Sequence, residues 1–434
     1  MNFTKTQLIF IGIAGFIVIV FGLVFAGVLP GRPKKPPQAI TATIEFWGVF
    51  DRASAYEDAI NNFKTVYPEV TIKYLEFNDE ENYKNALLDA LASGKGPDVL
   101  MLKNSELPRE INKIARAPDV KFNLLKLRQL FPKTVERDFV SGGGIYALPL
   151  SIDTLALIYN RDLLNQEGIA VLPETWEDFK LLIPRLVKID QIKNLEMAGA
   201  AIGGSQKNID SATDLLYALM LQTGTKMVSE DLKNAIFASK EGINAVEFYT
   251  GFADPKKPEY TWNETMPNSL DGISQGKVAM IFNYASSIRQ IKSRSPFIDL
   301  GVAPFPQPKS AAQTLTYPNY WGYAVSQQSK NKNIAWDFII SLTNNPENAK
   351  KYLEETKRPP ALLPILDQYA NDPELSVFAK QALIARSWPQ TDPKKIALVF
   401  SEMIENINPG KVKLGDAIKQ AEKQVTEIMG RKTF

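Results

Sequence analysis

The first segment of the chain is apolar and carries no charge from Leu8 to Leu29. A helix needs about 20 such residues to cross the hydrocarbon core of a bilayer. The pattern therefore predicts that residues 1–29 form a signal anchor with one transmembrane helix. A cleaved signal peptide is the alternative, because Val24-Phe25-Ala26 has the small-residue spelling of a cleavage site. Residues 30–40 contain four prolines and predict an extended linker, so the folded body is expected to begin near Ile40.

Beyond the linker, apolar positions alternate between the spacing of strands and the spacing of helices. Strands are predicted at Thr41–Trp47, Val70–Phe77 and Val99–Leu102, with helices between them over 54–67 and 82–91. The first helix opens on Ser54-Ala55-Tyr56-Glu57, which has the spelling of a capping box, and Gly94 is the expected C-terminal cap of the second. Strands that alternate with helices predict a mainly parallel sheet with helices on both faces.

Ligands of such sheets bind at the carboxyl ends of the strands. Trp47, Phe50, Asp51 and Asn104 fall at those ends, and Trp47, Asp51 and Asn104 are candidate binding residues. Each has a structural alternative, since a tryptophan at a strand end can pack in the core and Asp51 can cap the following helix. For Asp98, which follows Gly96-Pro97, the structural role of fixing the turn is favoured.

The stretch from 144 to 179 predicts a passage between two folded bodies. Ala147–Leu150 and Leu155–Tyr159 have the pattern of buried strands, whereas Ser151, Asp153 and Thr154 between them are short and polar. Beyond Pro149 the pattern changes to longer helices, one of them capped at Thr175-Trp176-Glu177-Asp178 after Pro173. The sequence thus predicts a second lobe. Trp176 and Trp336 are expected in the core, and Trp262 remains ambiguous.

Composition narrows the functional classes. The 434 residues are 45% hydrophobic, enough for two lobes of ordinary domain size, and 50 Lys and Arg stand against 48 Asp and Glu. A net charge of +2 gives no sign of a nucleic-acid partner. Cys and His are absent, which excludes disulfides, thiol nucleophiles, histidine acid–base catalysis and the usual zinc sites. We expect no catalytic residue, cofactor or metal, because binding without chemistry needs the fewest assumptions.

Seven sequence pieces carry a resemblance to a known family. They are IEFW, ASGKGPDVLM, GGIYALPLSIDTLALIYNRDLL, LPETWEDF, GKVAMIFN, APFPQPK and WGYAVSQQSKNKNIAWDFI. In this order and spacing the chain resembles the extracellular solute-binding proteins of ABC importers, family 1, the maltose-binding-like sugar binders. The resemblance covers roughly Ile44 to Met429.

The resemblance implies an α/β fold of two lobes, the type II periplasmic-binding-protein-like fold, with the ligand in the interlobe cleft. Lobe one is then expected at 41–149 and 303–346, and lobe two at 150–302 and 347–434. Asp153 stands where the family often places a carboxylate that accepts hydrogen bonds from sugar hydroxyls. Trp47 and Asp51 fall on the first strand-to-helix loop, Tyr284 follows GKVAM, and Trp321 faces the cleft.

A sugar offers hydroxyl groups and apolar C–H faces, so its binder needs carboxylates, amides and flat aromatic surfaces. The predicted aromatic faces are Trp47, Tyr284, Trp321 and Trp388, and the predicted polar contacts are Asp51, Asn104 and Asp153.

The resemblance implies the extracytoplasmic binding component of an ABC importer, which delivers a carbohydrate to a membrane permease driven by an ATPase. We expect a monomer tethered to the cell membrane through its N-terminal helix, since the chain lacks the cysteine of lipoprotein relatives. A membrane-tethered solute sensor and a binder of a non-sugar solute are alternatives. An exported carbohydrate-active enzyme is less favoured, because the acidic pairs Glu354-Glu355 and Glu402 with Glu405 have the setting of solvated helix faces.

Overall fold

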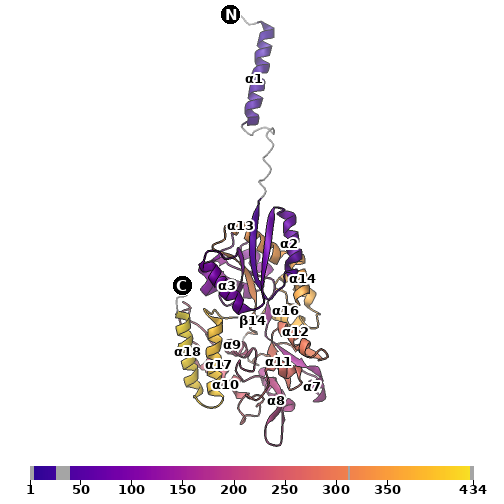
Figure 1. The fold of residues 1–434 in the computed structure, drawn as a ribbon, viewed down its shortest axis with the longest axis vertical. Coiled ribbons are helices and arrows are strands. Elements are labelled where there is room, and N and C mark those ends of the chain that lie inside the picture. The colour runs from indigo at the N-terminus through magenta and orange to yellow at the C-terminus, as the bar shows by residue number, and fades with distance from the viewer. Residues whose placement is uncertain (1–3, 26–39, 311–312, 431–434) are drawn as a thin grey trace. The chain divides into compact units, whose positions relative to one another are not determined.

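The computed structural model describes residues 4–25, 40–310 and 313–430. Its first helix, α1 (Lys5–Phe25), contains a stretch from Lys5 to Leu23 with a mean hydropathy of 2.4, long and apolar enough to cross a membrane. Side chains such as Phe10 and Phe16 are exposed. Figure 1 shows this helix with the label α1. The end of the predicted anchor and the linker up to residue 39 lie outside the described residues.

The first sheet has the strand order β2-β1-β3-β15-β4, and β7 pairs with β15 off this path. Its strands are β1 (Ala42–Val49), β2 (Val70–Phe77), β3 (Val99–Lys103), β4 (Ile114–Ala115), β7 (Leu148–Pro149) and β15 (Trp321–Ser326). β1 and β3 are parallel, as predicted, but β15 is antiparallel to β3, β4 and β7. The prediction of a mainly parallel sheet is therefore wrong, because β15 arrives from the distant second sheet and not through a helical crossover from a neighbouring strand.

Helices flank this sheet in sequence and in space (Figure 1). They are α2 (Ser54–Val66), α3 (Glu80–Ala92), α4 (Leu107–Glu110), α5 (Leu124–Leu130), α6 (Lys133–Phe139) and α13 (Lys332–Asn344), with the short hairpin β5 (Val140–Ser141) and β6 (Gly144–Ile145) following α6. Trp336 of α13 is fully buried, which confirms its predicted place in the core.

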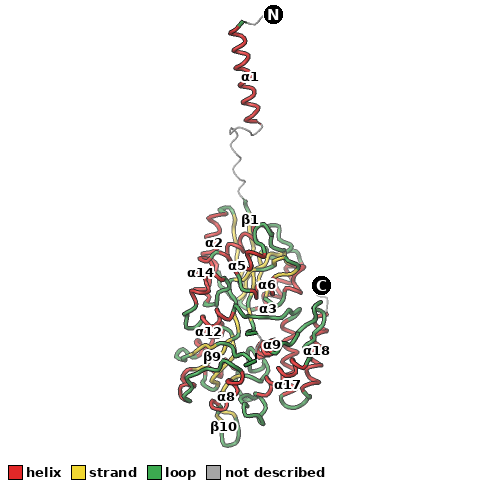
Figure 2. The backbone as a smooth tube through the Cα atoms, turned by 180° about the vertical axis from the view of Figure 1, so that it is seen from behind, coloured by secondary structure: helices red, strands yellow, loops and turns green. Residues whose placement is uncertain are grey.

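The second sheet has the order β10-β11-β12-β9-β13. Its strands are β9 (Ala156–Asn160), β10 (Lys188–Ile189), β11 (Leu195–Ala201), β12 (Val278–Asn283) and β13 (Leu300–Ala303). Every residue of β12 is buried, since helices cover the sheet. These helices are α7 (Arg161–Gln166), α8 (Trp176–Leu186), α9 (Ala212–Gln222), α10 (Lys240–Gly251), α11 (Ser269–Ser274), α12 (Ala285–Arg294), α17 (Pro393–Ile407) and α18 (Leu414–Gly430), the last two packed side by side (Figure 2).

The chain passes between the two sheets at neighbouring places. The first passage joins β7 to β9 through β8 (Asp153–Thr154), and the second joins β13 to β15 through β14 (Pro318–Asn319). β8 and β14 pair with each other as an antiparallel ribbon, and Ser151 forms a bridge with Pro360. The short polar run predicted as a passage thus lies where the chain leaves one sheet for the other.

Several local predictions are confirmed. Thr175 accepts a hydrogen bond from the Asp178 amide at the start of α8. The C-cap of α3 is Ser93, and the predicted Gly94 follows it in the left-handed conformation, with a φ of +69°. Asp98 accepts bonds from the Glu45 amide and the Ser329 hydroxyl, a structural role. The helix predicted to open at Ser54 is confirmed, because α2 begins at that residue. Its hydroxyl donates to Glu355, however, which is not the bond of a capping box.

The remaining helices, α14 (Pro346–Thr356), α15 (Leu363–Leu366) and α16 (Ser376–Gln381), lie between α13 and α17 in sequence. α14 contacts α13 and bonds to residues beside the first sheet, as in the pair Asn62 and Asn348 at 2.7 Å. The predicted lobe boundary at 346 stays a prediction, and these contacts favour a boundary after α14.

Candidate functional site

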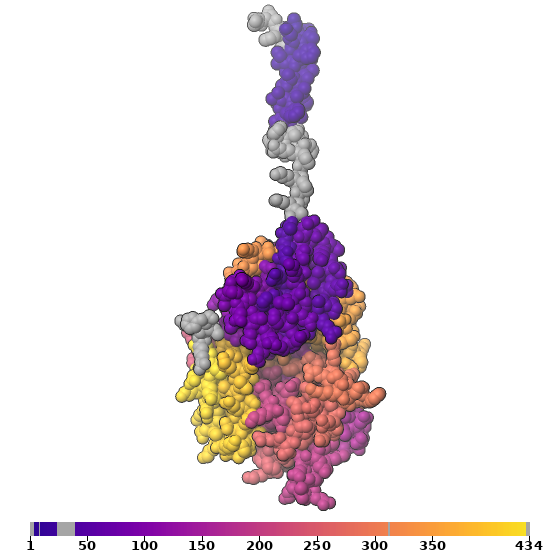
Figure 3. Space-filling model, in the orientation of Figure 1, coloured from indigo at the N-terminus to yellow at the C-terminus, as the bar shows by residue number. Residues whose placement is uncertain are grey.

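A pocket of about 860 Å³ is lined by residues from around both sheets. Residues near the first sheet contribute Glu80, Tyr83, Lys84, Lys103, Asn104, Glu106 and Trp321; residues near the second contribute Gln206, Thr213, Asp214, Tyr217, Tyr317 and Gln390. The purple surface of the first region and the magenta, orange and yellow surface of the second meet along a recess (Figure 3). Trp321 and Asn104 are therefore the two predicted site residues that line this pocket.

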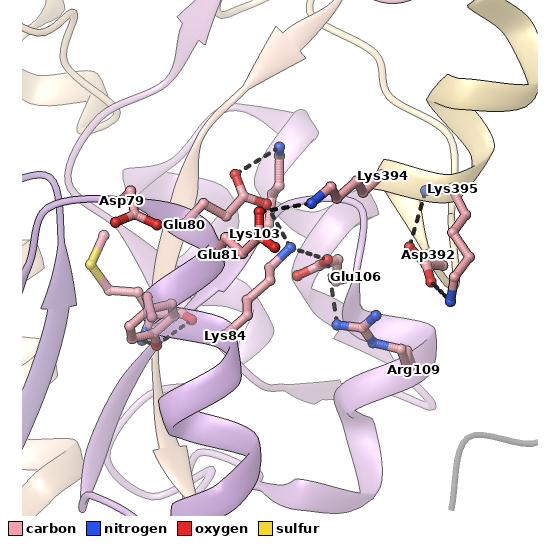
Figure 4. A network of polar contacts seen from close by, with 12 residues as sticks. Asp79, Glu80, Glu81, Lys84, Lys103, Glu106, Arg109, Asp392, Lys394 and Lys395 are labelled. Carbon is pink, nitrogen blue, oxygen red and sulfur yellow. Dashed lines mark hydrogen bonds and ion pairs between the residues drawn. The ribbon is translucent and has the colours of Figure 1, made fainter. Parts of the chain in front are cut away.

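Charged side chains from α3, β3 and α4 form a connected network on the first side of the pocket (Figure 4). Lys84 Nζ lies 2.6 Å from both Glu80 Oε1 and Glu106 Oε1, and Lys103 also contacts Glu80 at 3.4 Å. Glu106 is only 2% exposed, so its charge is held by Lys84 and by Arg109 at 3.6 Å. Burial favours the neutral forms, but the Glu106 and Glu80 charges raise the pKa of Lys84 and the two lysines lower that of Glu80.

Trp321 begins β15 directly beside Lys103, its partner in the sheet register. The Lys84 ammonium stands 5.8 Å from the centre of the indole, and the ring packs at a steep angle against Phe50 and Tyr83. A cation above an indole face is attracted by the electrons of the ring. This tryptophan is thus held by its neighbours and only 8% exposed.

The second side of the pocket is built around the first turns of α9. Asp214 accepts a hydrogen bond of 2.6 Å from the Tyr284 hydroxyl, and Gln206 donates to Thr213 at 2.8 Å. Burial raises the pKa of Asp214, and the bond from Tyr284 opposes that shift. The two sides together offer carboxylates, ammonium groups, amides and hydroxyls around an aromatic face.

Two predicted carboxylates do not line the pocket. Asp51 is buried beneath Arg358, Tyr56 and Tyr352, which all contact its oxygens. Asp153 accepts bonds from the backbone amides of Ala285 and Ser286 and thereby caps the N-terminus of α12. Both side chains thus have structural partners, and neither acts as a helix cap for the segment that directly follows it.

Three predicted aromatic residues also lie outside the pocket lining. Tyr284 does not line the pocket itself, but its hydroxyl donates a hydrogen bond to Asp214, which does. Trp388 is buried against Tyr217, with 5.4 Å between the ring centres, and Trp47 packs on Phe77 at 5.3 Å. Ligand contact by Asp51, Asp153 and these three residues stays a prediction.

The sequence interpretation missed Glu80, Lys84, Lys103, Glu106, Asp214 and Tyr217. A signal for the first three was present: Glu80 and Lys84 follow the end of β2, and Lys103 ends β3. Ligand-binding residues were expected at the carboxyl ends of the first and third strands, and none was expected after the second strand. Asp214 and Tyr217 gave no such signal, because they lie on a helix and not at a strand end. Only the fold places this helix opposite the residues of the first sheet that line the same pocket. Among the described residues, no group of three or more acidic side chains is arranged to hold a metal ion.

Comparisons with known proteins identify the family. The family model described as "Bacterial extracellular solute-binding protein" matches residues 48–349. The galactooligosaccharide-binding protein of Bacillus subtilis is 22% identical over 79% of this chain and 78% of its own length. The maltotriose-binding protein of Pyrococcus abyssi is 23% identical over 74% of this chain and 65% of its own length.

Solved structures share the fold. The cyclic alpha-maltosyl-1,6-maltose binding protein of Arthrobacter globiformis superposes with a TM-score of 0.75 at 17% identity, over 90% of this chain and 100% of that one. UgpB of Mycobacterium tuberculosis in complex with glycerophosphocholine gives 0.72 at 17% identity, over 90% and 99%. Both similarities concern the fold. The chain belongs to the bacterial extracellular solute-binding proteins, a family of binding proteins and not of enzymes.

Proposed function

We propose that this protein is the extracytoplasmic binding component of an ABC importer and that it binds a carbohydrate in the pocket between its two sheets. The observation that carries the proposal is the pocket itself, which combines the Trp321 ring with many hydrogen-bonding groups in a member of the solute-binding family. The names of the Bacillus and Pyrococcus relatives support a sugar ligand.

The charge of the pocket supports a neutral ligand. Six basic and six acidic side chains line it, and the most buried carboxylate, that of Glu106, is already neutralised by Lys84 and Arg109. Such groups retain lone pairs and N–H donors for sugar hydroxyls, which can both donate and accept. A strongly anionic or cationic solute would have to disrupt this balance. We therefore propose Glu80, Lys84, Lys103, Asn104, Asp214 and Trp321 as the ligand-contacting set.

The mechanism that fits this architecture is closure around the ligand. The passages through β8 and β14 connect the two sheets, so small backbone rotations there would move one sheet region against the other. A ligand that contacts both sides stabilises the closed form, which then docks on a permease whose transport is driven by an ATPase. The protein would act as a monomer.

The N-terminal helix α1 would tether the body to the outer face of the cell membrane. Its length and hydropathy support an anchor, and cleavage near Ala26 with release of the body is the alternative. The mass of the protein isolated from its native cells separates the two, because a cleaved chain lacks its first 26 or so residues.

The test of binding is a thermal-shift screen of the full chain in a mild detergent. The panel contains maltose, maltotriose, a galactooligosaccharide, mannitol, glycerophosphocholine and single amino acids. A ligand that binds only the native state raises the melting temperature. We expect a shift with a neutral sugar, without its turnover, that Trp321→Ala reduces. Shifts confined to glycerophosphocholine or amino acids would overturn the carbohydrate assignment, and hydrolysis of the sugar would overturn the binding-only role.

A further inference from the structure

Tyr217 carries a buried hydroxyl group that has no hydrogen-bond partner among the described residues. The residue lies on α9 and is 1% exposed. Its ring is clamped by Tyr317, Trp388 and Phe400, with ring centres 5.6, 5.4 and 4.9 Å away. Packing therefore sets the position of the hydroxyl. The Thr213 side chain is near enough to act on the pKa of Tyr217 but forms no hydrogen bond with it of the geometry that the other buried tyrosines show.

Other buried tyrosines in the described part of the chain show how such a group is normally treated. The hydroxyl of Tyr249 donates to the Gly204 carbonyl at 2.7 Å, and those of Tyr284 and Tyr320 donate to Asp214 and Asp138. A buried hydroxyl without a partner costs free energy, because it has lost water and gained nothing in exchange. Of the buried tyrosines that the structure describes, Tyr217 alone leaves its oxygen unpaired.

Tyr217 also lines the pocket. It follows Thr213 and Asp214 by four and three residues on α9, so the three side chains share one face of the helix. That face borders the pocket, since all three are lining residues. Tyr217 thus belongs to the same wall as the carboxylate and hydroxyl that its helix presents, and its oxygen is covered in this conformation.

The adjacent indole strengthens this observation. Trp388 Nε1 is buried and likewise has no hydrogen-bond partner among the described residues, and its ring meets that of Tyr217 edge to face. Two unpaired polar groups in one aromatic cluster beside a pocket are unusual, because native interiors contain few of them and those few tend to mark functional positions.

We propose that Tyr217 is a specificity-determining residue, whose hydroxyl forms a hydrogen bond with one hydroxyl group of the bound sugar. The inference rests on the proposed carbohydrate function and deepens it. The free protein carries the cost of an unpaired group, and the ligand relieves it. A solute without a hydroxyl at this position leaves the group unpaired and binds more weakly, as sites built for a hydroxyl reject analogues that lack it.

Tyr217→Phe tests the proposal, since it removes the oxygen and keeps the ring. We expect the melting temperature of the ligand-free variant to equal or exceed that of the wild type, because no hydrogen bond is lost. The sugar for the affinity measurement is the one among maltose, maltotriose and a galactooligosaccharide that gives the largest thermal shift. Its affinity, measured by calorimetry, should fall roughly tenfold or more in the variant.

Tyr249→Phe is the matched control, because it removes the same atom from a buried tyrosine of the neighbouring helix that does have a partner. This variant should melt lower than the wild type and keep its sugar affinity. A Tyr217→Phe protein that melts lower by as much as the control would show that the hydroxyl has a partner within the fold. Unchanged sugar affinity in Tyr217→Phe would overturn the assignment of Tyr217 alone. A wild type that no sugar of the panel stabilises would overturn the carbohydrate function on which it rests.

Discussion

Arg358 and Asp51 are separated by 307 positions in the chain, yet their side chains form a largely buried ion pair with 2.8 Å between Arg358 Nη2 and Asp51 Oδ1. Tyr352 and Tyr56 donate to the other carboxylate oxygen at 2.8 and 3.2 Å. Burial raises the pKa of Asp51, whereas Arg358 and the tyrosines oppose that shift. The pair therefore fastens the loop after β1 to the segment that follows α14.

Asp51→Ala should destabilise the fold strongly, because it leaves the Arg358 guanidinium buried without a counter-charge. We expect a loss of about 3–5 kcal/mol in the free energy of unfolding, measured in urea. Arg128→Ala is the control, since its pair with Glu136 is exposed and should contribute less than about 1 kcal/mol. Unaltered stability of Asp51→Ala with lost sugar affinity would instead restore Asp51 as a ligand contact.

Asp153→Ala should also act on stability. The change removes the acceptor for the first amides of α12, which face a buried environment, and we expect a cost of about 1–3 kcal/mol. Asp153→Asn retains one oxygen and should cost less. If sugar affinity disappears in Asp153→Asn while the urea midpoint is unchanged, the residue contacts the ligand as the family resemblance implies.

Two buried carboxyl groups, those of Asp138 and Asp153, each contribute stability that declines as the pH rises through the range from about 4 to 6. Burial raises the pKa of Asp138 to about 6, against the bonds donated by Ser387, Tyr320 and Asn104, and burial raises that of Asp153 to about 6 as well. The folded state then holds protons that the unfolded state, with carboxyl pKa values near 3.8, has released. The contribution of each group is fully present below pH 3.8 and is lost as the pH passes 6.

Asp138→Asn isolates one of these groups. The amide cannot ionise, so the unfolding free energy of the variant, measured from pH 4 to 7, should gain on that of the wild type as the pH rises, by up to about 3 kcal/mol across the range. An identical slope in both proteins would mean that Asp138 has an ordinary pKa in the folded state. Glu136→Gln, on the surface of the same helix, provides the comparison.

Lys394 and Glu81 form an exposed pair at 2.9 Å between the starts of α17 and α3, on opposite sides of the pocket (Figure 4). If the two sides separate when the ligand leaves, Lys394→Glu should weaken sugar binding about two- to fivefold at low salt, and 1 M NaCl should abolish the difference. Adding Glu81→Lys to this variant should restore the affinity. Calorimetry at two salt concentrations measures the effect, and a loss that persists in high salt would contradict it.

Local patterns in the sequence predicted many features correctly because their causes are local. Thr175 caps α8 through an amide three residues away, and Gly94 accommodates the left-handed turn after α3. Trp176 and Trp336 follow the apolar face of their helices into the core. The helix begins at Ser54 as predicted, but the Ser54 hydroxyl donates to Glu355, a distant residue, which is not the bond of a capping box.

The candidate site was predicted only in part. Trp321 and Asn104 line the pocket because both lie where strands of the first sheet begin or end, which the sequence reveals. Asp51 and Asp153 have the same kind of position. Nevertheless, Asp51 pairs with Arg358, and Asp153 accepts hydrogen bonds from the first amides of α12. A residue's place on a strand end is a local property, whereas the partner that its carboxylate finds depends on segments far away in the chain.

The sequence by itself determined the family, the alternation of strands and helices and the apolar N-terminal helix, because each of these follows from motifs or from the spacing of nearby residues. Only the tertiary structure decided the direction of β15, the network of Lys84 with Glu80 and Glu106, and the unpaired hydroxyl of Tyr217. These features depend on which distant side chains meet in a low-dielectric interior, where a polar group needs a partner and its absence is costly. The periodicity of apolar residues along the chain does not predict which distant side chains come into contact.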